Sequence, residues 1–142
     1  CLKAVKALNS IGIHPDLFDL RVINPLNLED VIGSFQRTGR LVTVDTGHKT
    51  HGIGGEIVAQ VMESAGSSSK GSPIRIGLPD HPIPSSRGYI PGIYPDALKI
   101  ILAVCEMLEV SATQKAKCVK HSIGKSDKLP IDVPEPGFTG PF

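Results

Sequence analysis

The sequence predicts an α/β domain built as a three-layer sandwich, with a mostly parallel sheet flanked by helices. Short apolar runs alternate with segments whose apolar residues recur every three or four positions, which indicates alternating strands and helices. Residues 40–56 pass from an apolar run through a glycine-rich turn into a helical pattern, as a strand, loop and helix would. The length of 142 residues suits one domain with a sizeable core.

Helical spacing of apolar residues predicts helices at residues 2–8, 28–37, 53–65 and 96–109. Asn27 is expected to cap the second helix, and Gly39 to end it in the left-handed conformation. The buried face of the last helix is predicted to include Leu98, Ile101 and Leu108. Because the first helical pattern begins at residue 2, the chain opens within an amphipathic helix. We therefore expect it to be a piece of a longer protein.

Short apolar runs predict strands at residues 17–20, 41–44 and 73–78, with room for one or two more. Residues 66–72 are rich in Ser and Gly and predict a flexible surface loop. The prolines after the third strand predict an ordered, irregular crossing before the last helix. From residue 110 the chain is first lysine-bearing and then proline-rich, so we expect a tail that stays loose or lies along a neighbouring surface.

Composition excludes several classes of function. A net charge of +1 provides no long-range field for nucleic acid or a membrane. No apolar stretch approaches the roughly 20 residues of a membrane span. Lys3 and Lys6 interrupt any signal-peptide segment, which favours the cytoplasm, with the mitochondrial matrix as the alternative. The three cysteines have no metal-ligand spacing and are expected as free thiols.

The loop at residues 46–55 is the first place to look for function, because ligands and partners bind at the carboxyl ends of parallel strands. Its glycines begin like a dinucleotide fingerprint, but Ile57 replaces the third glycine. A phosphate loop is also excluded, since Ile53 and Gly54 replace the Lys and Ser/Thr that it needs. Glycines that allow close packing at the start of a helix explain the pattern better than a nucleotide site does.

Other polar residues near this edge leave two interpretations open. His48, His51 and His81 could meet to bind a metal or move protons, but exposed or interfacial loop histidines are favoured. Asp45 and Asp80 each follow an apolar strand, where a carboxylate is either catalytic or caps loop N–H groups. The sequence contains neither a nucleophile elbow nor a pair of carboxylates at a diagnostic spacing, so it indicates no particular reaction.

Six groups of residues occur in a familiar order: Asp19-Leu20-Arg21; Pro25-Leu26; Thr38 to Val42; Val44-Asp45 with Thr50, Gly52, Gly54 and Glu56-Ile57; Pro79-Asp80 with Pro82 and Pro84; and Tyr94-Pro95-Asp96. Together they resemble the C-terminal domain of the transketolase superfamily, most closely that of the 2-oxoacid dehydrogenase β subunit. The resemblance divides the chain into a domain at residues 1–109 and a polar, Pro-rich tail at residues 110–142. Asn27, Thr46 and His51 depart from the usual Asp, Glu and Gly.

The resemblance implies a non-catalytic structural and dimerisation domain of a thiamine diphosphate-dependent enzyme. In such enzymes other domains bind thiamine diphosphate and Mg²⁺, and this chain lacks their Gly-Asp-Gly motif. No catalytic, cofactor-binding or metal residue is therefore assigned, and the chain is not expected to be active alone. The implied partners are catalytic domains or subunits of the same enzyme, a second copy in a homodimer, and the acyltransferase core.

The residues expected at a subunit interface lie in the loop and in the proline-rich crossing: Thr50, Gly52, Gly54, Glu56, Asp80, His81, Pro82 and Pro84. Glycine and proline allow close backbone approach at both places. An alternative hypothesis is a stand-alone protein-interaction module on the same fold, whose lysine-bearing tail binds an acidic partner. The substrate cannot be chosen from this sequence, because the resemblance places substrate contacts in other domains.

Overall fold

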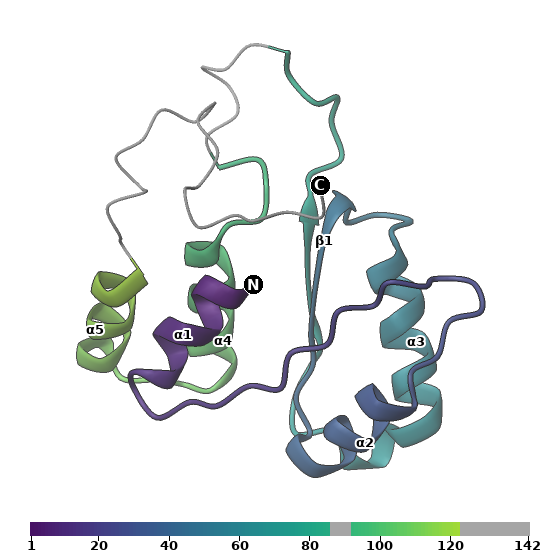
Figure 1. The fold of residues 1–142 in the computed structure, drawn as a ribbon, viewed down its shortest axis with the longest axis horizontal. Helices are drawn as coiled ribbons and strands as arrows, with labels where there is room; N and C mark the ends of the chain where they lie inside the picture. The colour runs from purple at the N-terminus through teal and green to yellow at the C-terminus, as the bar shows by residue number, and fades with distance from the viewer. Residues whose placement is uncertain (86–91, 123–142) are drawn as a thin grey trace.

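Helices and strands alternate along most of the chain. The computed structural model describes residues 1–85 and 92–122. Its elements are, in order, α1 (Leu2–Asn9), α2 (Glu29–Thr38), β1 (Val42–His48), α3 (Ile53–Ala65), the 3-10 turn η1 (Gly66–Ser68), β2 (Ile74–Leu78), α4 (Ala97–Met107) and α5 (Ala112–Ser122). Figure 1 shows the strands between α1, α4 and α5 on one side and α2 and α3 on the other. The predicted three-layer α/β sandwich is confirmed.

The sheet of the described residues consists of β1 and β2, which run parallel. Val44 lies opposite Ile76 and His48 opposite Leu78, with an irregularity in the register between these two pairs. Because successive strand residues point to opposite faces, Val44 and Ile76 pack against the layer of α1, α4 and α5. Thr43 lies on the other face, beneath Gly54 of α3. The strands predicted at residues 41–44 and 73–78 are confirmed as β1 and β2.

The strand predicted at residues 17–20 does not form, which corrects the sequence analysis. Residues 13–23 have no regular secondary structure. Asp16 instead accepts a hydrogen bond from Ser34 and forms an ion pair with Arg37, both on α2. The segment is thereby tied to a helix, and side chains expected in the core are exposed, with Phe18 40% exposed. An apolar run alone does not distinguish a strand from such a segment.

Two hydrophobic clusters lie on opposite faces of the sheet. One is formed by α1, α4 and α5 around Leu8 and Ile101, and the other by α2 and α3 around Phe35 and Val61. Leu98 and Leu108, predicted on the buried face of the last helix, are 41% and 39% exposed. They lie near the two ends of α4, whereas its buried residues are central and include Ile101. The buried stripe of α4 is therefore narrower than the sequence predicted.

Side chains and a glycine mark the helix ends, at or near the positions that the sequence indicates. The N-cap residue of α2 is Leu28, one position after the predicted Asn27, but Asn27 Oδ1 still accepts a hydrogen bond of 3.0 Å from Glu29 N in the first turn. Gly39 ends α2 with a φ of 69°, in the left-handed region. Asp96 Oδ1 accepts a hydrogen bond of 2.7 Å from Lys99 N at the start of α4. The loop predicted as flexible is also anchored, because Lys70 N donates to Gly39 O over 2.9 Å.

The first part of the predicted tail is helical. α5 packs against α1 and α4 and buries Cys118 and Ser122, so this part lies along a neighbouring surface, one of the two expected arrangements. Residues 123–142, including the predicted proline-rich extension, lie outside the described residues, as do residues 86–91 of the crossing. Among the residues that are described, no helix is long and apolar enough to cross a membrane.

Candidate functional site

The loop after β1 and the crossing after β2 lie at the same edge of the sheet, because parallel strands end at the same side. Lys49 N donates a hydrogen bond of 2.9 Å to Leu78 O, which continues the pairing of the strands past the end of β1. Arg75 Nη1 then donates to Lys49 O over 3.0 Å from the neighbouring strand. The loop is therefore held to β2 before α3 begins.

Side chains join the loop to the crossing. Thr50 Oγ1 donates a hydrogen bond to the Asp80 carboxylate. Nδ1 of His48 lies 3.0 Å from the carbonyl oxygen of Pro79, to which the Nδ1–H tautomer donates. His81 N donates to the same carbonyl oxygen over 2.9 Å. The structure thus brings together predicted site residues from both segments, Thr50 from the loop and Asp80 with His81 from the crossing.

The remaining predicted residues divide into internal and exposed positions. Gly54 is buried, and a Cβ placed there would lie 2.7 Å from Thr43 Oγ1, so this glycine allows α3 to approach β1. A Cβ on Gly52 would lie 2.2 Å from the carbonyl oxygen of His48. Glu56 is exposed and accepts a hydrogen bond of 2.7 Å from Gln60, one turn further along α3. The crossing residues Pro82 and Pro84 are exposed and half-buried, respectively.

The three loop histidines are exposed. Within residues 1–85 and 92–122, no three His, Cys, Asp or Glu side chains converge in a way that could hold a metal ion. Asp45 Oδ1 accepts a hydrogen bond of 3.1 Å from Gly47 N, which is the capping role weighed for this carboxylate.

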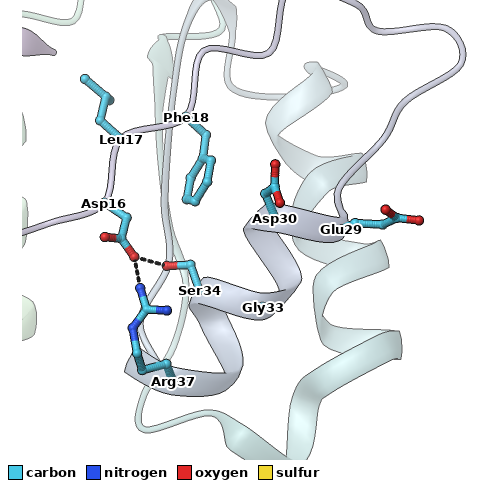
Figure 2. A pocket seen from close by; sticks show the side chains of 8 residues that line it. All are labelled: Asp16, Leu17, Phe18, Glu29, Asp30, Gly33, Ser34 and Arg37. Carbon is cyan, nitrogen blue, oxygen red and sulfur yellow. Dashed lines mark hydrogen bonds and ion pairs between the residues drawn. The ribbon is translucent and has the colours of Figure 1, made fainter.

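A second feature, absent from the sequence analysis, is a hollow of about 580 Å³ between residues 16–18 and the outer face of α2. Figure 2 shows its lining residues: Asp16, Leu17, Phe18, Glu29, Asp30, Gly33, Ser34 and Arg37. The Asp16 carboxylate closes one end through Ser34 Oγ, at 2.6 Å, and Arg37. The helical part of this lining could have been recognised from sequence, because its positions recur along one face of a helix. The contribution of residues 16–18 could not have been recognised from sequence.

The sequence is similar to those of known proteins. A family model described as "Transketolase, C-terminal domain" matches residues 1–92. The chain belongs to this family. It is 32% identical over 111 residues, 78% of its length, to the pyruvate dehydrogenase E1 component subunit beta, mitochondrial, of Bos taurus. The corresponding mitochondrial subunit of Saccharomyces cerevisiae is 36% identical over 100 residues, or 70% of the chain. The E1 subunit beta of Rhizobium meliloti is 34% identical over 103 residues, or 72% of the chain.

The chain spans 31%, 27% and 22% of the lengths of these three relatives. The family match covers α1 to β2 and most of the crossing, and thus includes every residue predicted at the interface. α5 lies beyond the matched residues of this transketolase C-terminal domain. α4 also lies beyond the matched residues, and α5 occupies part of the segment that the sequence predicted as a polar tail.

Two thiols lie between α4 and α5 in this family member. Cys105 and Cys118 are fully buried, and each thiol influences the pKa of the other. Burial raises the pKa of the Cys105 thiol, and burial together with the neighbouring Cys105 raises the pKa of Cys118. Because the thiolate is the reactive form, both groups are kept in the less reactive thiol form. We therefore assign them a packing role.

Proposed function

We propose that this chain is the non-catalytic C-terminal domain of a thiamine diphosphate-dependent 2-oxoacid dehydrogenase β subunit. The observation that carries the proposal is the similarity to pyruvate dehydrogenase E1 β subunits, of whose length the chain covers about a third or less. In this proposal the catalytic domains hold thiamine diphosphate and Mg²⁺, and this domain supports them. The chain's own residues carry out no chemical step.

The proposed contact with the rest of the enzyme is the edge where the loop and the crossing meet. Thr50, Asp80, His81 and Pro82 are exposed there. The hydrogen bonds from Thr50 to Asp80 and from Lys49 to Leu78 hold the two segments together before any partner binds. A surface ordered in advance loses less conformational entropy on association. Gly52 and Gly54 contribute by shaping the loop and seating α3 rather than by touching the partner.

The proposed partners are the catalytic domains of the same enzyme, a second copy in a homodimer, and the acyltransferase core of a dehydrogenase complex. The bovine and yeast relatives are named as mitochondrial. This favours the mitochondrial matrix over the cytoplasm as the place where the enzyme acts.

A calorimetric titration of the chain with thiamine diphosphate and Mg²⁺ tests the proposal. We expect no saturable heat, and a monomer or weak dimer by light scattering. The complete yeast E1 component, titrated under the same conditions, is the positive control. Saturable, Mg²⁺-dependent heat from this chain would contradict the proposal, and Gly52 to Glu56 would then be the first residues to substitute.

A stand-alone interaction module on the same fold is the second candidate, favoured by α5, which extends beyond the family match. The two candidates differ in what the gene encodes upstream of Cys1. A long coding stretch that includes a pyrimidine-binding domain with its activating glutamate supports the enzyme domain. An upstream stop codon followed by a nearby start codon supports the module.

A further inference from the structure

The helices α1 and α5 form one surface whose charged side chains are all basic. They carry five lysines, Lys3, Lys6, Lys115, Lys117 and Lys120, and contain no Asp or Glu. The two helices lie side by side, as Figure 1 shows, and pack through a shared cluster that includes Leu8 and Cys118. We call this the α1–α5 surface.

Several of these charges are available for binding. Lys6, Lys117 and Lys120 are exposed, and no ion pair among the described residues engages them. Lys117 and Lys120 are three positions apart, so they lie one turn apart on the same side of α5. Cys118 and Ser122 mark the buried face of this helix. The two lysines therefore present a paired positive charge to solvent.

The opposite layer of the sandwich has the opposite charge. α2 and α3 carry Glu29, Asp30, Glu56 and Glu63, and the basic residue within these two helices is Arg37, which is paired with Asp16. The net charge of +1 hides this separation. Because charges are screened over a Debye length of about 8 Å at physiological salt, a partner in contact with α1 and α5 meets mainly their lysines, although α4 of the same layer carries the exposed Glu106.

We propose that the α1–α5 surface binds an acidic segment of a partner protein. Carboxylates spaced by one helical turn on such a segment would match Lys117 and Lys120. Neither helix contains Phe, Tyr or Trp, and His121 of α5 is the one ring that these two helices offer for base stacking, which disfavours nucleic acid. The exposed residues of α5 are polar or alanine, and Leu2 is the one large apolar side chain exposed on α1 or α5, which is too little apolar surface to insert into a bilayer. The inference does not depend on the proposed enzyme, because it rests on the charges of α1 and α5 and not on the edge where the loop and the crossing meet.

The test measures binding of a fluorescein-labelled glutamate-rich peptide to the chain by fluorescence anisotropy. We expect saturable binding that weakens as salt is raised from about 50 to 200 mM, because screening increases. Lys117→Glu combined with Lys120→Glu should weaken binding roughly tenfold or more, since it places like charges opposite the peptide. Lys49→Glu with Lys70→Glu changes the net charge equally at exposed sites outside α1 and α5 and should leave binding nearly unchanged.

Three results would overturn the proposal. One is the lack of saturable peptide binding, and another is an equal loss in both double variants, which would show a general effect of net charge. The third is tighter binding to a DNA duplex or to phosphatidylserine vesicles than to the peptide. Circular dichroism verifies that the variants are folded. If the charge reversal unfolds the chain, Lys117→Gln with Lys120→Gln replaces it, and a smaller but measurable weakening is expected.

Discussion

Gly52 shows how one residue determines the shape of the loop edge. Its φ of −78° and ψ of 160° are accessible to any residue, so its backbone conformation does not require glycine. The lack of space requires glycine here, because a Cβ would lie 2.2 Å from the carbonyl oxygen of His48. Relief of that contact would require the backbone to move, since the carbonyl belongs to the last residue of β1.

We expect Gly52→Ala to lower the free energy of unfolding by about 1–3 kcal/mol, the usual range for overpacking. Gly33→Ala is the matched control, because Gly33 is exposed in α2 and a Cβ there meets nothing within 4 Å. The control should raise stability by roughly 0.5–1 kcal/mol through helix propensity. Urea unfolding measures both. Equal stability of Gly52→Ala and the unsubstituted chain would show that the loop relaxes freely.

Among the elements, α5 is the one whose packing the sequence analysis described least well. This helix is mostly polar. Its buried side chains are Cys118, which is fully buried, and Ser122, which is nearly so. Such a narrow stripe gives little periodic signal. The helix is nevertheless part of the fold, because Cys118 completes the cluster around Leu8 and Ile101.

Substitution of Cys118 tests whether α5 is integral. Cys118→Glu places a carboxylate among apolar side chains and should lower the free energy of unfolding by several kcal/mol or prevent folding. Ala116→Glu is the control, since Ala116 is exposed on the same helix and its substitution should change stability by about 0.5 kcal/mol or less. Thermal unfolding followed by circular dichroism distinguishes them. Similar melting temperatures would mean that α5 contributes little to the fold.

Residues 13–23 illustrate the reverse case, an apolar segment that does not become a strand. Side chains of this segment are largely exposed, with Val22 60% and Ile23 62% accessible. The contacts of Asp16 with α2 come from residues 18 and 21 positions further along the chain. A pattern within the segment cannot report contacts at such separations, so the segment's strand-like composition led to the wrong prediction.

At the scale of the whole molecule, two clusters share one small sheet. Val44 and Ile76 contact the cluster of α1, α4 and α5, whereas Leu41, just before β1, contacts the cluster of α2 and α3. Each cluster therefore packs against the same strands or their immediate extension. Loss of either one would leave a face of the sheet open to water, which links the stabilities of the two layers.

We therefore expect one cooperative unfolding transition. Phe35→Ala and Ile101→Ala each truncate a fully buried side chain, one in each cluster, and each should lower the free energy of unfolding by about 2–5 kcal/mol. Leu2→Ala is the control, because Leu2 is 69% exposed. Hydrogen exchange should show both layers destabilised by either core variant. Destabilisation confined to the layer that carries the substitution would contradict a single cooperative unit.

The sequence by itself determined the features that depend on neighbouring residues. The sequence determined the helices α1 to α4, the strands β1 and β2 and the Gly39 terminus, because periodicity and neighbouring side chains specify them. The order of the motifs also indicated the family that the comparison identifies.

Only the tertiary structure decided which distant residues meet. It joined Thr50 to Asp80, 30 positions away, tied Asp16 to α2, and placed α5 beside α1 to make a basic surface. These contacts depend on how layers pack and where strands end, and their free energies arise between segments far apart in the chain. No local pattern carries that information, because the same side chains would be compatible with several neighbours until the sheet and the two clusters fix their positions.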